Sequence, residues 1–290
     1  MCKKISVIGG DARIAMLANS FNQDGFDVLT YGFSPDVAFD GGVVGAGNLT
    51  DAVKEADVVI LGLPATGDDI TVRAPLFDGK IYFYDLLKAM KKEQLLIGGK
   101  ITPKIKNLCK IYNIPVIDYF EREELTVLNA IPTAEGAIEI AMKTLPITIH
   151  GSKSLVLGFG RIGKILAKDL SALGAKTYVE ARRFDDLSWI SAYGYRGIHL
   201  SHLKETLPNY DIIYNTIPHE ILTEDMLKLI RKDCPIIDLA SLPGGIDDEK
   251  AARYGLKVIH ALSLPGKAAP KTSGEIIKQT ILNIFSEMGV

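Results

Sequence analysis

The sequence predicts an α/β fold made of two doubly wound parallel-sheet domains. Short apolar runs, typical of buried parallel strands, alternate with amphipathic helical segments along the 290 residues. A strand that runs into a glycine-containing turn and then a helix occurs twice, at residues 5–22 and at 153–174. A chain of this length also suits two domains of ordinary size. We therefore expect a first domain over residues 1–125, a connection over 126–150 and a second domain over 151–290.

Composition and charge exclude several classes of protein. The formal net charge is −2, which gives no electrostatic case for binding nucleic acid or an anionic membrane. The three cysteines, Cys2, Cys109 and Cys234, are scattered and form neither a disulfide framework nor a metal-ligand spacing. The first residues run directly into a strand, and no apolar run approaches the length of a membrane span. We therefore expect a cytoplasmic protein.

The first domain is expected to contain six strands separated by helices. The run at 57–63 is continuously apolar, as in a strand that is covered on both faces. Thr50 suits the residue before a helix, and Pro103 suits a first helical turn. The expected strands are residues 5–8, 27–31, a short strand followed by a loop within 43–49, 57–63, 95–98 and 115–118, and the expected helices are residues 12–22, a segment from 49, 86–92 and 102–112.

The turn after the first strand reads Gly9-Gly10-Asp11 and resembles an incomplete nucleotide-binding turn. Ala12 and Arg13 stand where further glycines would be expected, so a second complete dinucleotide site is not expected here. The turn is expected instead to offer helix N–H groups and Arg13 to an anionic substrate.

The connection is expected to be a pair of helices that begins at Tyr119, with a break or kink at Pro132. Residues 129–136 are then expected to lie at an interdomain cleft, and residues 150–152 to form the hinge into the second domain. Glu135 is a candidate acid or base in that cleft, and helix capping is an equally simple role for it.

Residues 153–183 carry the strongest functional pattern. An apolar strand enters a glycine turn, a helix follows as far as Gly174, and a second strand covers 177–179. The first glycine of the turn allows a tight bend, the second allows a pyrophosphate to approach the helix N-terminus, and the third allows close helix–strand packing. This context predicts a Rossmann dinucleotide-binding domain whose turn residues are Gly158, Phe159, Gly160, Arg161, Ile162 and Gly163.

The end of the second strand predicts the kind of dinucleotide. Ala181 occupies the place where an acidic residue would bind the ribose hydroxyls of NAD, and Arg182 and Arg183 follow it. Guanidinium groups suit the 2′-phosphate of NADP, so we expect NADP; the alternative is that both arginines are solvated. Glu180 stands one place early and is expected to point to the opposite face.

The remainder of the second domain continues the alternation. Ser273 or Thr272 is expected to cap the last helix, 273–288, which either stays with this domain or packs back on the first. The expected strands are residues 197–199, 211–216, 235–239 and 257–260, and the expected helices before the last are residues 187–193, 202–207, 223–230 and 248–254.

In a doubly wound sheet, the loops after strands four to six face the nicotinamide half of the cofactor. The loops expected beside the nicotinamide are therefore residues 216–219, 240–245 and 264–272. From the first two loops we expect Thr216, Ile217, Pro218 and Ser241 to contact the cofactor.

Three polar side chains in these loops are candidates for substrate chemistry. Lys267 and Lys271 lie four residues apart near a helix N-terminus and suit a substrate with carboxylates, although each is equally explained as a solvated lysine. His219 is a candidate proton donor or acceptor at the nicotinamide, or else an exposed loop residue. His199 and His202 lack a third ligand, so no metal is expected.

Motifs along nearly the whole chain together resemble those of the A subunit of dipicolinate synthase. The Ile-Pro-Thr-x-Glu-Gly segment and the Ala-Pro-Lys-Thr loop are more specific than the glycine turn. The motifs are residues 7–13, 120–122, 131–136, 148–152, 158–163, 238–245, 264–266 and 269–274.

The resemblance implies oxidation of a dihydrodipicolinate, or of its hydrated precursor, with NADP⁺ for the dipicolinic acid of spores. It also implies a small dicarboxylate substrate and the B subunit of dipicolinate synthase as partner. Separately, we expect a homo-oligomer.

The fold is similar to that of D-2-hydroxyacid dehydrogenases as well. Leu242 stands at about the place of their catalytic arginine, which weakens that interpretation and leaves the general base unidentified. The alternatives are a dehydrogenase of another small carboxylate, or a nucleotide-binding subunit that is catalytic only with its partner.

Overall fold

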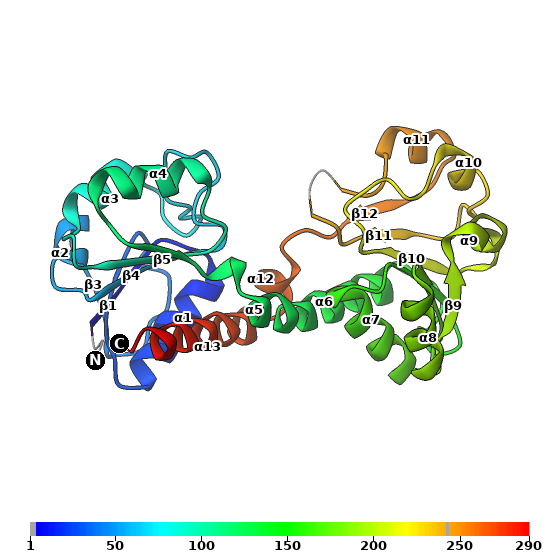
Figure 1. Ribbon diagram of the computed structural model, residues 1–290, viewed down its shortest axis with the longest axis horizontal. Helices are drawn as coiled ribbons and strands as arrows, with labels where there is room; N and C mark the ends of the chain where they lie inside the picture. The colour runs from blue at the N-terminus through cyan, green and yellow to red at the C-terminus, as the bar shows by residue number, and fades with distance from the viewer. Residues whose placement is uncertain (1–3, 242–243, 290) are drawn as a thin grey trace. The chain divides into compact units, whose positions relative to one another are not determined.

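The computed structural model describes residues 4–241 and 244–289, which form two compact units (Figure 1). Unit 1 holds the described residues as far as Leu128 together with those from Ala269 onward, and unit 2 is Asn129–Ala268. Each unit contains one six-stranded sheet in which every pair of neighbouring strands is parallel. The two parallel-sheet domains of the prediction are therefore confirmed.

The sheet of unit 1 has the strand order β3-β2-β1-β4-β5-β6. Helices cover both of its faces, with α1 and α13 on one face and α3 and α4 on the other (Figure 1). The elements are β1 Lys4–Ile8, α1 Ala12–Gln23, β2 Asp27–Tyr31, β3 Val43–Gly45, α2 Leu49–Val53, β4 Val58–Leu61, α3 Phe83–Ala89, β5 Leu95–Gly98, α4 Pro103–Tyr112, β6 Val116–Asp118, the 3₁₀ turn η1 Tyr119–Glu121, α5 Glu123–Leu128 and α13 Pro270–Met288.

Local chemistry explains where these helices begin and end. The Thr102 hydroxyl accepts the Ile105 N–H and Pro103 starts α4, while Asn113 ends it with a left-handed conformation of φ 56°. The predicted cap Thr50 is wrong, because α2 begins earlier and is capped by Asn48, whose side chain accepts the Asp51 N–H at 2.9 Å.

Helix α13 belongs to unit 1, where it packs along α1. Ile277 and Ile281 lie with Ile14 and Leu17 in one buried cluster. A Cβ added to Gly274 would lie 2.6 Å from the carbonyl oxygen of Arg13, so the glycine allows this close approach. The sequence left open whether this helix stays with residues 151–290 or packs back on the first domain; in the structure, its packing against α1 groups it with unit 1.

Unit 2 has the strand order β12-β11-β10-β7-β8-β9. Its first strand, β7, lies between β8 and β10, so the strand order reverses there, where open α/β sheets bind ligands. The elements are α6 Ala130–Thr144, β7 Lys153–Leu157, α7 Arg161–Ala172, β8 Lys176–Ala181, α8 Phe184–Ala192, β9 Arg196–His199, α9 Leu200–Thr206, the 3₁₀ turn η2 Leu207–Asn209, β10 Ile212–Asn215, α10 Glu224–Leu227, β11 Ile236–Asp238, α11 Asp248–Arg253, β12 Val258–His260 and α12 Leu264–Ala268.

Three local predictions are wrong. The helix pair breaks at Asn129 rather than at Pro132: α5 ends at Leu128 and α6 begins at Ala130, so Pro132 lies in the first turn of α6, where a proline removes no helical hydrogen bond. Residues 264–268 form α12 rather than a loop. Helix α13 starts at Pro270 rather than 273, and the Ser273 hydroxyl donates to the Ala269 carbonyl instead of capping the helix.

Candidate functional site

The turn between β7 and α7 has the geometry that its three glycines suggest. Gly158 has φ 92°, a left-handed conformation that favours glycine. A Cβ on Gly163 would lie 2.1 Å from the Gly158 carbonyl oxygen, so only glycine allows the helix to pack this closely. A Cβ on Gly160, by contrast, would meet no atom of the described residues within 4 Å. The start of α7 is therefore open to a phosphate group.

The segment after β10 lies directly against this turn. The Thr216 hydroxyl donates to the Leu157 carbonyl at 2.8 Å. A Cβ on Gly158 would lie 2.7 Å from that hydroxyl and 2.8 Å from Ile217 Cγ1. Thr216 and Ile217 thus form one wall of the region above the glycine turn.

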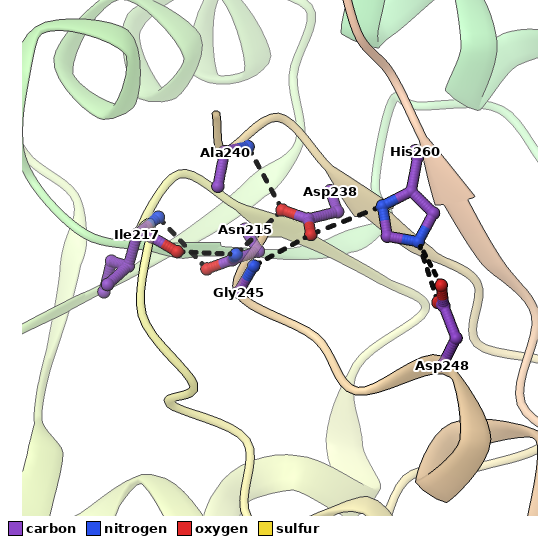
Figure 2. A network of polar contacts seen from close by, with 7 residues as sticks. All are labelled: Asn215, Ile217, Asp238, Ala240, Gly245, Asp248 and His260. Atoms are coloured by element: carbon purple, nitrogen blue, oxygen red, sulfur yellow. Dashed lines mark hydrogen bonds and ion pairs between the residues drawn. The ribbon is translucent and has the colours of Figure 1, made fainter. Parts of the chain in front are cut away.

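A buried carboxylate, Asp238 at the end of β11, connects the neighbouring strand ends (Figure 2). It accepts hydrogen bonds from the Asn215 amide at 2.9 Å and from the Ala240 and Gly245 N–H groups at 3.1 Å each. The Asn215 side chain in turn holds Ile217, donating to its carbonyl oxygen and accepting its N–H. Two fully buried side chains therefore fix the segments that follow β10 and β11.

His260, at the end of β12, closes this network (Figure 2). Its Nδ1 lies 3.6 Å from the Asp238 carboxylate, and its Nε2 lies 2.7 Å from the Asp248 carboxylate on α11. The ring is about one third exposed. The three strands β10, β11 and β12 thus each contribute a polar side chain at the same edge of the sheet.

The two arginines after β8 have different surroundings. Arg183 donates its Nε to Asp185 at 2.9 Å in a largely exposed ion pair, which raises the pKa of Arg183 and lowers that of Asp185. Arg182 is exposed, and within the described parts of the chain its guanidinium has no hydrogen-bond or ion-pair partner. Ala181 is buried. Arg182 is therefore the freer of the two guanidiniums.

Glu180 lies in the interior, on the sheet face opposite Ala181. The residue is 1% exposed, and neither carboxyl oxygen has a hydrogen-bond partner among residues 4–241 and 244–289. Burial raises the pKa of this carboxyl, while the Gly158 amide and the charge of Arg182 act in the opposite direction. The absence of a carboxylate at position 181 is thus accompanied by a buried acid one residue earlier.

The residues nominated in the loops lie on several different elements. Lys267 is exposed on α12 in unit 2, and Lys271 is exposed in the first turn of α13 in unit 1. Ser241, nominated for the cofactor, is exposed after β11 in unit 2. Pro218 and His219 follow Ile217 after β10; His219 is exposed and makes no hydrogen bond or ion pair within residues 4–241 and 244–289.

Glu135 lies on α6, away from the glycine turn. With Asp169 of α7 and Leu173, which follows that helix, it lines a mostly apolar groove of about 570 Å³. Asp169 comes nine residues after Gly160, or about 13 Å along the helix axis. Burial raises the pKa of Asp169, and the charge of Glu135 raises it further.

Sequence reasoning missed Asn215, Asp238 and His260. The available signal was that each of them ends an apolar strand, since parallel strand ends meet at one edge. Leu242, named as the counterpart of a catalytic arginine, lies outside the described residues.

Other kinds of site are absent from the described residues. These contain no group of three His, Cys, Asp or Glu side chains placed to hold a metal ion. None of the helices within residues 4–241 and 244–289 has the length and apolarity that a membrane span requires. Cys109 and Cys234 are free and buried, and burial raises their thiol pKa values to about 11 and about 12.

Comparisons with known proteins identify one family along nearly the full length of this chain. Residues 4–120 match the family described as the N-terminal domain of the dipicolinate synthase A subunit. The chain is 33% identical over 288 residues to the A subunit of dipicolinate synthase from Bacillus subtilis strain 168, covering 98% of this chain and 96% of the relative. The chain belongs to the family of dipicolinate synthase A subunits.

Solved structures of this family have the same fold. The A chain of dipicolinate synthase from Bacillus subtilis is 33% identical, with a TM-score of 0.87 over 100% of this chain and 97% of that one. The corresponding A subunit from Bacillus halodurans is 30% identical, with a TM-score of 0.86 over 97% of each chain.

The nucleotide-binding half matches a second, broader family. Residues 133–257 match the NAD-binding domain of D-isomer-specific 2-hydroxyacid dehydrogenases. This range contains the glycine turn and the strand ends at Asn215 and Asp238. The chain is therefore an oxidoreductase-like protein with a nicotinamide dinucleotide site in unit 2.

Proposed function

We propose that this protein oxidises dihydrodipicolinate, or its hydrated precursor, to dipicolinate with NADP⁺. The observation that carries the proposal is the match, over nearly the full length of both chains, to a protein named as the A subunit of dipicolinate synthase. The open glycine turn of unit 2 supports it, because a dinucleotide needs an unobstructed helix N-terminus.

From dihydrodipicolinate, the reaction removes two electrons and two protons from the ring; from the hydrated precursor, one water molecule leaves as well. One hydrogen leaves as hydride to the nicotinamide, which is the chemistry that the cofactor supplies, and the other leaves as a proton. Aromatisation favours this direction, so the protein needs mainly to orient the C–H bond and accept a proton.

The residues around the glycine turn are proposed to hold the cofactor. Gly160, Arg161 and Ile162 at the start of α7 would face the pyrophosphate, with Gly158 and Gly163 shaping the turn and Phe159 beside it. Thr216, Ile217, Pro218 and Ser241 would lie on the nicotinamide side, since they follow the strand ends beyond β7.

The choice of NADP rests on the end of β8. Ala181 presents no carboxylate to repel a 2′-phosphate, and Arg182 presents an unpaired guanidinium among the described residues. Arg183 contributes less in this proposal, because Asp185 already occupies its guanidinium.

For the substrate, Lys267 and Lys271 are proposed to attract its carboxylates, and His219 is the candidate for accepting the proton. Glu135 is not retained in this role, because it lines a groove with Asp169, about 13 Å along α7 from Gly160. The B subunit of dipicolinate synthase is proposed as a partner, since the relatives are named as the A subunit of that synthase. Self-association into a homo-oligomer is part of the same proposal.

The second candidate is a dehydrogenase of another small carboxylate. The match of residues 133–257 to the 2-hydroxyacid dehydrogenase domain favours it. A substrate comparison separates this candidate from the first.

The test is the absorbance of NADPH when the purified protein is mixed with NADP⁺ and freshly generated dihydrodipicolinate. We expect NADPH and the ultraviolet spectrum of dipicolinate to appear together. Turnover of 2-hydroxy acids alone would contradict the proposal and favour the second candidate. If NADPH binds without turnover and turnover appears when the B subunit is added, the protein binds the nucleotide but is catalytic only in the complex.

A further inference from the structure

The imidazole of His199 connects two neighbouring strand ends on the adenosine side of the proposed cofactor site. His199 ends β9 and pairs in register with Ala181, the last residue of β8. Its Nε2 lies 3.1 Å from the carbonyl oxygen of Arg182. The ring therefore contacts the main chain of the residue whose guanidinium is unpaired within the described residues.

The hydrogen bonds of His199 are consistent with one neutral tautomer. Nδ1 accepts the Ser201 N–H at 3.3 Å, capping α9, and also lies 2.7 Å from the Ser201 hydroxyl. A ring nitrogen that accepts a backbone N–H carries no proton, so the proton is on Nε2. Nε2 then donates to the Arg182 carbonyl, which can only accept. Both nitrogens are thus engaged within the protein.

A second contact holds the same segment. The exposed ring of Phe184 stacks on His199 with centroids 5.0 Å apart and planes 8° from parallel. Phe184 begins α8 two residues after Arg182. The chain is therefore attached to the imidazole both at Arg182 and at Phe184, across the bend from β8 into α8.

We propose that His199 is a positioning residue for coenzyme choice: it holds the main chain at Arg182 so that the guanidinium projects toward a 2′-phosphate. This inference rests on the proposed use of NADP. His199 does not bind the phosphate itself, because its two nitrogens are already occupied. A fixed main-chain origin reduces the freedom that a long arginine side chain loses on binding, so the contact strengthens binding of NADP and leaves NAD unaffected.

The experiment measures dissociation constants for NADPH and NADH by nucleotide fluorescence, without substrate or partner. The wild type is expected to bind NADPH at least about tenfold more tightly than NADH, since a charge-assisted contact to the phosphate is lost with NADH. His199→Ala should weaken NADPH binding about fivefold and change NADH binding by less than about twofold. His199→Gln, whose amide also offers an N–H donor, should recover most of the preference.

Two controls separate positioning from a general structural effect. His202→Ala removes an exposed histidine of α9 that, among the described residues, lies 4.0 Å from the Glu205 carboxylate, and it should leave both constants unchanged. In an Arg182→Ala background, His199→Ala should cause no further loss of preference, because the side chain it positions is gone.

The outcomes are decisive in each direction. Equal weakening of both coenzymes by His199→Ala, or an unchanged NADPH constant, would overturn the inference while leaving the proposed function standing. A wild type that prefers NADH would overturn the use of NADP, and the inference with it. If His199→Ala does not fold, Phe184→Ala tests the same attachment from an exposed position, and a partial loss of NADPH preference is then expected.

Discussion

At the scale of single residues, Glu180 is an acidic side chain placed in an interior that disfavours its negative charge. Its carboxyl is buried and has no hydrogen-bond partner in the part of the chain that the structure describes, and burial raises its pKa above the ordinary 4.5. An acid whose folded-state pKa is raised is destabilising when ionised. The contribution of this group to the free energy of unfolding is therefore fully present at acidic pH, and it is lost as the pH rises through the folded-state pKa.

Glu180→Gln is therefore expected to stabilise the protein at pH 8 by roughly 1–2 kcal/mol, because the amide cannot ionise in the interior. At pH 4 the variant and the wild type should have the same free energy of unfolding. Denaturant titration at the two values of pH measures the difference. Glu139→Gln, at an exposed glutamate paired with Lys143, is the matched control and should have little effect at either pH. A destabilised Glu180→Gln at pH 8 would mean that the ionised carboxylate is satisfied in solution.

The two adjacent arginines allow a comparison within one segment. Arg182→Ala is expected to raise the KM for NADP⁺ about tenfold or more, since a charge-assisted hydrogen bond contributes about 1.5–3 kcal/mol. The KM for NAD⁺ should hardly change. Arg183→Ala should have an effect below about threefold, because Asp185 already pairs with that side chain. Equal effects of Arg182→Ala on the two coenzymes would remove the argument for NADP.

At the scale of elements, the β7–turn–α7 unit assigns a different task to each glycine. Gly163 is required by packing, since a Cβ there would collide with the Gly158 carbonyl, whereas a Cβ on Gly160 would contact none of the residues that the structure describes. Gly163 is therefore needed for the fold to pack, whereas Gly160 is needed to leave room for the ligand.

Gly163→Ala is expected to lower the free energy of unfolding by about 1–3 kcal/mol and to weaken dinucleotide binding with it. Gly160→Ala should keep the wild-type melting temperature but weaken binding, because the added methyl group would obstruct the pyrophosphate. Thermal unfolding and NADPH fluorescence on the same preparations test this. Unchanged binding by Gly160→Ala would show that the cofactor does not approach the helix there.

The strand ends of unit 2 form the other informative element. Asp238 and Asn215 tie the segments after β10 and β11 to each other, and His260 adds the end of β12 (Figure 2). Sequence alone nominated those segments by topology, but named surface residues in them. The buried side chains that hold them depend on a pairing of residues 23 positions apart.

At the scale of the whole molecule, the proposed chemistry is divided between units. The dinucleotide site lies in unit 2, while Lys271 lies in unit 1. Binding of coenzyme and binding of substrate should therefore respond to different substitutions.

Lys271→Ala is expected to raise the KM for dihydrodipicolinate several-fold, because a carboxylate loses its cationic partner, and to leave the NADPH dissociation constant unchanged. Steady-state kinetics and nucleotide fluorescence measure the two effects separately. Lys110→Ala, at an exposed lysine near the end of α4, is a control of the same charge in the same unit. Kinetics equal to those of the wild type would show that Lys271 is merely solvated.

The sequence by itself determined the features that depend on neighbouring residues. Strand and helix alternation, the two parallel sheets and the conformation of the Gly158–Gly163 turn all follow from local spacing, turn chemistry and apolar periodicity. The absence of an acid at position 181 was likewise visible in the chain.

Only the tertiary structure decided the features that depend on distant partners. It attached α13 to α1, where Gly274 meets the Arg13 carbonyl, and it buried Asp238 against Asn215. It also brought His199 to the main chain of Arg182, a contact between residues 17 positions apart. The physical reason is that burial and hydrogen bonding are properties of the packed chain. The same residue type is exposed to water in one place and buried in a hydrogen-bond network in another, depending on which residues the fold brings beside it.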